Sequence, residues 1–225
     1  MIMMSIFSMF DPSTSNNFSM NWMAIVLMLF LIPKNYWMIP NRWNMVLIII
    51  FQSMISEFKI LLKKKDHYFN MILFMGLFLM ILLNNYFGLM SYIFVPSSHM
   101  VFGLTLSLSI WLGINMYGWY KYYNHMFAHL VPSGISSMML MMFLVVVETI
   151  SNLMRFGSLA LRLSANMIAG HVVLMLISTL MEFSYSLAMI AGMIQILLII
   201  LELMVSFIQA YVFTMLVISY TSEIP

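Results

Sequence analysis

Long apolar stretches follow one another along the chain, and their lengths predict helices that cross a membrane. A spanning helix needs about 20 mostly apolar residues, and the ranges 18–39, 68–90 and 100–120 each satisfy that length. Trp22 and Trp37 lie towards the two ends of the first range, at the depth where tryptophan is enriched in membrane proteins. We therefore expect these three ranges to span the membrane.

The range 41–65 has a different pattern. Its continuous apolar part, 45–51, is too short to cross a membrane, and the range then gathers Glu57, Lys59 and three lysines at 63–65. This pattern is typical of an amphipathic helix that lies on the membrane surface with its lysines among the lipid headgroups. A plain solvated connector is the alternative.

Two longer apolar ranges, 138–180 and 187–220, make up most of the C-terminal half. The first would be about 65 Å long as a helix, against a hydrocarbon core of about 30 Å. Neither a proline nor a hydrophilic turn divides it, so we expect one long, strongly tilted helix. After a polar turn at 181–186, the second range runs back. The predicted fold is a single all-α membrane domain with about five membrane-embedded helices and one amphipathic surface helix.

Composition agrees with this pattern. The chain is 64% hydrophobic and 7% charged, whereas soluble domains carry about 25% charged residues. The net charge is +2 without a large basic block, which argues against nucleic acid as a partner. The absence of cysteine excludes disulfides and thiolate metal sites, and we expect no cofactor.

Basic residues predict the orientation of the chain. Lys63–Lys65 precede one expected span and Lys121 follows the next, so the positive-inside rule puts both on the inner side. The turn at Pro96 and the N-terminus are then on the outer side. The last long helix returns to the inner side with the C-terminus.

Polar residues recur at seven-residue intervals in the two longest apolar ranges. Seven residues return within about 20° on a helix, so each set forms one stripe. The sets are Glu148, Arg155 and Arg162, extended by Asn166, and then Gln195, Glu202 and Gln209. A charge at mid-membrane costs about 2.5–3.5 kcal/mol, so we interpret the stripes as a proton path with ionisable groups at several depths. Buried ion pairs that merely fix the helix register are the alternative.

A hairpin folded near Phe183 predicts which positions of the two stripes face each other. It puts Arg162 near position 204, level with Glu202 and Gln209, and it puts His171 near Gln195. His171 comes nine residues after Arg162, about 180° around the helix, and therefore lies off the arginine stripe. A histidine titrates near pH 6.5 and suits proton relay, although it could instead bond a backbone carbonyl. The remaining histidines, His67, His99, His125 and His129, are expected at the membrane interfaces.

Three stretches resemble the a subunits of mitochondrial F-type ATP synthases, also called subunit 6. They are ETISNLMR (Glu148–Arg155), LALRLSANMIAGH (Leu159–His171) and LELMVSFIQAYVFTML (Leu201–Leu216). The N-terminal half matches that family only in its layout of spans. One departure is Phe156 with Ser158, where relatives usually have a proline just after the Arg155 position. That departure leaves the helix geometry before Arg162 open.

The resemblance implies a role for each polar residue. Arg162 would face a proton-carrying carboxylate on a rotating ring of c subunits. His171 and Glu202 would line a half-channel from the intermembrane space, and Glu148 would belong to a matrix half-channel. Asn166 and Gln209 would be polar neighbours of the arginine, while Arg155 and Gln195 are secondary candidates.

The resemblance also implies a setting. The chain would be a non-catalytic subunit of the Fo sector in the mitochondrial inner membrane, with its N-terminus in the intermembrane space and its C-terminus in the matrix. Its partners would be the c ring, other Fo and peripheral-stalk subunits and the lipid bilayer. Two other classes stay open at this point: an independent proton or ion transporter, and a purely structural membrane subunit.

Overall fold

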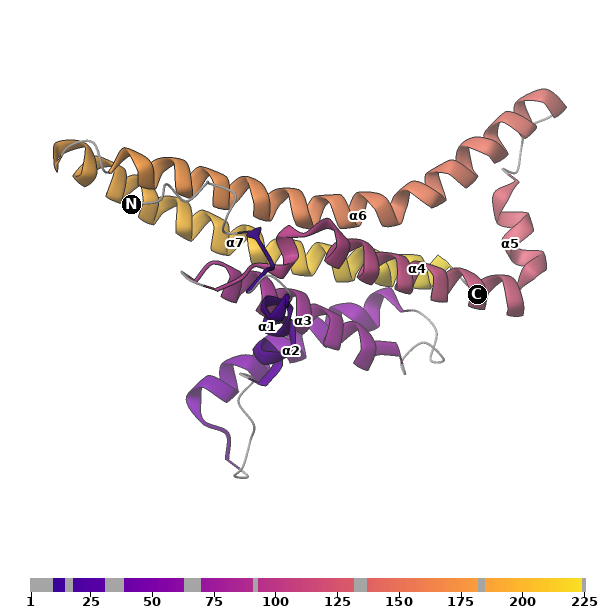
Figure 1. The fold of residues 1–225 in the computed structure, drawn as a ribbon. Coiled ribbons are helices and arrows are strands. Elements are labelled where there is room, and N and C mark those ends of the chain that lie inside the picture. Colours follow the sequence, from indigo (N-terminus) through magenta and orange to yellow (C-terminus); the bar gives the residue numbers. More distant parts are fainter. Residues whose placement is uncertain are drawn as a thin grey trace.

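The chain folds into helices, and the two longest lie side by side (Figure 1). The computed structural model describes residues 10–14, 18–30, 39–62, 70–90, 93–131, 137–181 and 185–223. Its elements are η2 (Met20–Met23), α1 (Ala24–Phe30), α2 (Arg42–Leu61), α3 (Met71–Gly88), η4 (Pro96–Ser98), α4 (Met100–Lys121), α5 (Tyr123–Leu130), α6 (Met138–Leu180) and α7 (Tyr185–Glu223). Five of these helices, α2, α3, α4, α6 and α7, are long and apolar enough to cross a membrane. The expectation of an all-α integral membrane protein is confirmed.

The N-terminal ranges are described only in part. The expected first span is helical from Met20 to Phe30, and residues 31–38 lie outside the described ranges, as do the lysines at 63–65 and His67. Within α2, residues 44–61 also have the length and composition of a span. The location of α2 on the membrane surface therefore stays a prediction.

α6 is one continuous helix of 43 residues, Met138–Leu180, which passes through Phe156 and Ser158 without a break. α7 has 39 residues and begins at Tyr185, two residues before the expected start. In Figure 1 the first half of α6 rises away from α7, and many of its apolar side chains are exposed, for example Met139 at 87%. The tilt of both helices in a membrane stays a prediction.

α5 lies between the expected spans 100–120 and 138–180, where no helix was expected. An isolated helix of eight residues is unstable in water. Here Phe127 packs edge-on against Trp119 of α4, with ring centroids 4.9 Å apart. This aromatic contact between helices stabilises α5, and the local pattern of polar residues gave no sign of it.

α6 and α7 are covered on one side by α4 and α3. α4 packs against α6, and α3 packs against α7. At Gly103 of α4, an added Cβ would lie 3.0 Å from the backbone oxygen of Ala160, so two small residues allow the helices to approach closely. Between α3 and α7, the fully buried ring of Phe78 packs against the ring of Phe207, with centroids 6.0 Å apart. These contacts leave the opposite side of α6 open.

Candidate functional site

The middle of α6 has one covered face and one open face. Buried positions follow helical spacing and are Leu159, Ala160, Leu163, Ser164, Met167 and His171. Arg162 and Asn166 fall between them, one turn apart, and both are exposed. The guanidinium of Arg162 therefore belongs to the face that points away from the rest of the chain.

Glu202 of α7 packs directly against Gly170 of α6. A Cβ added to Gly170 would lie 2.5 Å from Oε1 and 2.8 Å from Cδ of Glu202, closer than side chains approach each other in proteins. Only glycine, which has no side chain, leaves room for the carboxyl group here. The contact shows which residues of α7 lie beside Gly170 of α6.

A small cavity of about 20 Å³ lies beside this contact, with room for about one water molecule. Its polar lining comes from both long helices. The lining residues are Asn166, Met167, Gly170, Glu202, Val205, Ser206 and Gln209. The structure thus brings together three of the predicted polar residues, Asn166, Glu202 and Gln209.

The register of the hairpin differs from the one predicted from the midpoint of the turn. Glu202 meets Gly170, which is eight residues or about 12 Å of helix beyond Arg162, and it is therefore not level with the arginine. The predicted level of Glu202 was therefore wrong, whereas Gln209 lines the same cavity as Asn166, one turn from Arg162. Gln195 lies another seven residues towards the outer end, so it is not the residue level with His171.

His171 is next to this contact and is buried, with 5% of its surface exposed. The ring of Phe10 packs edge-on against it, with centroids 6.4 Å apart. Nε2 of His171 and Oε2 of Glu202 are both buried without a hydrogen-bond partner in the described structure. Two titratable groups near the same level of the hairpin thus each have a buried atom without a described partner.

Sequence reasoning missed three further buried polar residues. Asn84 and Asn85 of α3 and Ser97 of η4 are each fully buried, and each has a side-chain atom without a described partner. η4 contacts both α3 and α6, so these residues lie on elements that pack together. Buried polar groups of this kind are usually satisfied by ordered water. Two adjacent asparagines inside an apolar range were the signal that could have found them.

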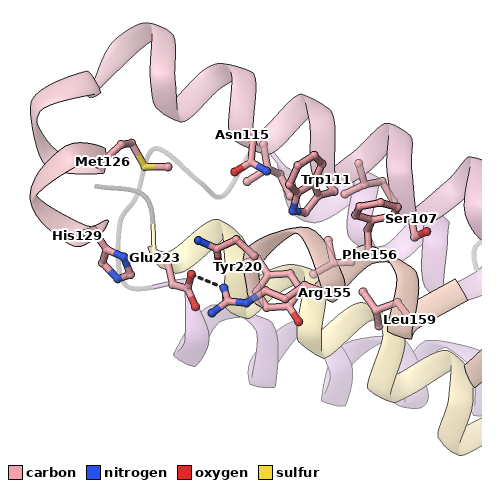
Figure 2. Close-up of a pocket in the computed structure, with 14 residues that line it drawn as sticks. Ser107, Trp111, Asn115, Met126, His129, Arg155, Phe156, Leu159, Tyr220 and Glu223 are labelled. Carbon is pink, nitrogen blue, oxygen red and sulfur yellow. Dashed lines mark hydrogen bonds and ion pairs between the residues drawn. The ribbon is translucent and has the colours of Figure 1, made fainter. Parts of the chain in front are cut away.

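A second cavity, of about 60 Å³, lies nearer the C-terminal end of α7 (Figure 2). Arg155 forms an ion pair there with Glu223, at 2.8 Å between Nη1 and Oε2, and its guanidinium lies over the ring of Tyr220 at 4.9 Å. Asn115, His129 and Asn152 are among the polar groups around the cavity, which has room for several waters. Glu223 was not among the predicted site residues, because its partner is 68 positions away in sequence.

The other predicted residues do not line the smaller cavity. Glu148 lies half-buried on the rising half of α6 and is not part of the lining of either cavity. His125 and His129 are exposed on α5. His99 is instead packed against two aromatic rings, with centroids 5.2 Å from Trp22 and 5.3 Å from Phe94, and its Nε2 is buried.

Fold and site together define a class, an all-α multi-pass membrane protein whose long terminal hairpin carries polar groups at separate depths. A family model described as "ATP synthase A chain" matches residues 18–222. The chain is 46% identical over 224 residues to ATP synthase subunit a of Drosophila melanogaster, and 44% identical over 226 residues to that of Anopheles gambiae. Both matches cover 99% of this chain and all of the relative. The chain belongs to the ATP synthase A chain family.

Proposed function

We propose that this chain conducts protons in the membrane sector of an ATP synthase, and that Arg162 separates two half-channels. One observation carries the proposal, namely the order of features along α6. The lining of the larger cavity ends at Leu159, the lining of the smaller one begins at Asn166, and Arg162 lies between them on the exposed face. A proton that follows this order would have to leave the chain and be carried past the arginine by a partner.

Family membership supports this role. The relatives that match over their whole length are ATP synthase a subunits, so the chain is a component of that complex. An independent transporter and a purely structural subunit, the two classes that the sequence left open, are not favoured by this match. ATP chemistry would belong to other subunits of the complex.

The outer half-channel would consist of buried polar groups around Glu202 and His171. Asn84, Asn85 and Ser97 would extend it through α3 and η4, since each has a buried polar atom that water could satisfy. The inner half-channel would include the cavity at Arg155 and Glu223, with Glu148 further along α6. Asn166 and Gln209 line the smaller cavity with Glu202 and would be the polar groups next to the arginine on the outer side.

Electrostatics would make Arg162 a divider. A ring carboxylate within about 4–6 Å of the guanidinium would be favoured in its ionised form and would give up its proton to one half-channel. Arginine itself cannot deprotonate and so blocks direct leakage between the half-channels. Each proton that crosses gains about 2.3 kcal/mol per 100 mV, which would drive the ring round.

The exposed face of α6 would meet a ring of c subunits, and lipid and other Fo and peripheral-stalk subunits would cover much of the remaining apolar surface. Asn115 near the C-terminal end of α4 and Glu223 near that of α7 line one cavity, so these two helix ends lie on the same side. With Lys121 on the inner side, this supports a C-terminus in the matrix and an N-terminus in the intermembrane space of mitochondria.

The test replaces Arg162 in the assembled complex. Arg162→Ala is expected to abolish ATP-driven acidification of membrane vesicles and ATP synthesis, while the complex still assembles. Arg42→Ala, at the exposed start of α2, is the matched control and should pump normally. ATP synthesis retained by Arg162→Ala would overturn the proposal.

A further inference from the structure

A hydrogen bond joins α2 to α7 behind the candidate proton path. The hydroxyl of Tyr211 donates to Oε2 of Glu57 over 2.9 Å, between residues 154 positions apart in sequence. Both side chains are half-buried. Neither residue lines the two cavities, so the proposed function gives this contact no role.

The surrounding contact between α2 and α7 is apolar. Met54 and Phe58 of α2 and Leu62, which directly follows it, recur every four residues and are buried in the same cluster as Ala210 and Phe213 of α7. Apolar burial is non-directional and leaves a helix free to turn slightly about its axis. A hydrogen bond to a carboxylate is directional and stronger than a neutral one, so the Glu57–Tyr211 bond can fix that rotation.

Helix geometry places this bond opposite the polar stripe of α7. Tyr211 comes two residues after Gln209 and nine after Glu202, which is about 200° and 180° around the helix. Glu202 and Gln209 face α6, and Tyr211 therefore faces away from α6 towards α2. The helix is held on one side by the Gly170–Glu202 contact and on the other by the bond to Glu57.

A small turn of α7 would have a large effect on the carboxyl group of Glu202. At a side-chain radius of about 5–6 Å, a rotation of about 10° moves a group by about 1 Å. A displacement of about 1 Å at a reacting group can cost a factor of about 100 in rate.

We infer that Glu57 is a positioning residue that acts through Tyr211 to hold α7 at the rotation that turns Glu202 and Gln209 towards α6. This inference rests on the proposed function of the hairpin as a proton path. In this role α2 would hold α7 in position from the side opposite α6, in addition to its predicted place on the membrane surface.

The test measures protons pumped per ATP hydrolysed in vesicles, normalised to assembled complex. Tyr211→Phe keeps the ring and removes the donor, whereas Glu57→Leu removes the acceptor at similar size. Each is expected to lower pumping by about 10- to 100-fold, the loss that a displacement of up to about 1 Å can bring, and the double variant should be no worse than either. Glu57→Gln keeps an acceptor oxygen and should restore most of the pumping. Ser53→Ala, on the exposed part of α2, is the control.

Three results would overturn the inference: normal pumping by Tyr211→Phe, no rescue by Glu57→Gln, or losses that multiply in the double variant. A fall in assembled complex with unchanged pumping per complex would also overturn it, because that outcome shows a role in stability alone. Arg162→Ala measured in the same vesicles separates the two proposals. If it pumps normally, the proposed function fails; if it is inactive while Tyr211→Phe pumps normally, only the positioning role fails.

Discussion

Gly170→Ala should impair proton transport while leaving the complex assembled. The added Cβ would lie 2.5 Å from Oε1 of Glu202, whereas ordinary contact begins near 3.4 Å, so the carboxyl group must retreat by about 0.9 Å. The atom that must move is the end of a flexible side chain, so the cost in stability should be at or below the lower end of the roughly 1–3 kcal/mol that overpacking incurs. The functional cost should be larger, about 10- to 100-fold in pumping per complex.

The assay is ATP-driven acidification of vesicles, with the assembled complex quantified on a native gel. Gly192→Ala is the matched control on the same hairpin, because its Cβ would meet only Met181 Cε at 3.9 Å, an ordinary contact. A second variant tests the cause directly. Glu202→Asp in the Gly170→Ala background shortens the acid by one methylene and should recover part of the pumping.

Two outcomes would refute this reasoning. Pumping by Gly170→Ala at the level of Gly192→Ala would show that the position of the Glu202 carboxyl group does not limit proton transport. A loss of pumping that Glu202→Asp worsens rather than relieves would show that the added methyl acts through another contact.

Three further substitutions test other parts of the structure. Gly103→Ala should cost about 1–3 kcal/mol of stability, because its Cβ would meet the rigid backbone of Ala160 at 3.0–3.2 Å. Less assembled complex on native gels and a lower Tm would show this cost. Asn85→Leu removes a buried amide with no described partner, and it should leave the complex at least as stable while slowing proton conduction through vesicles. Glu223→Gln breaks the partly exposed ion pair with Arg155, and it should cost only about 0.2–1 kcal/mol of stability but slow passive proton flux; unchanged flux would remove this cavity from the path.

The long helices could be predicted from the sequence because their evidence is local. An apolar range without proline or polar turn can hardly avoid forming one helix, and α6 has the expected bounds of 138 and 180. The open and covered faces around Arg162 also follow from helical spacing, since Arg162 and Asn166 are one turn apart on the exposed face and the buried residues recur at the same spacing on the other.

The alignment of the hairpin could not be predicted, because it depends on contacts between side chains of the two helices. Gly170 gives no periodic signal and is one of 9 glycines in the chain, yet it is the position that Glu202 packs against. The Arg155–Glu223 and Glu57–Tyr211 pairs join positions 68 and 154 residues apart. Only the packing of α2, α6 and α7 brings such partners together.

The open face of α6 has a consequence for how the chain matures in the cell. In a bilayer, an uncovered Arg162 would meet lipid at a cost of about 2.5–3.5 kcal/mol. If the proposed partner covers that face, a newly inserted chain would carry this cost until the partner binds. The same arginine that divides the proposed path would thus favour late assembly with a partner and would mark unassembled chains for quality control.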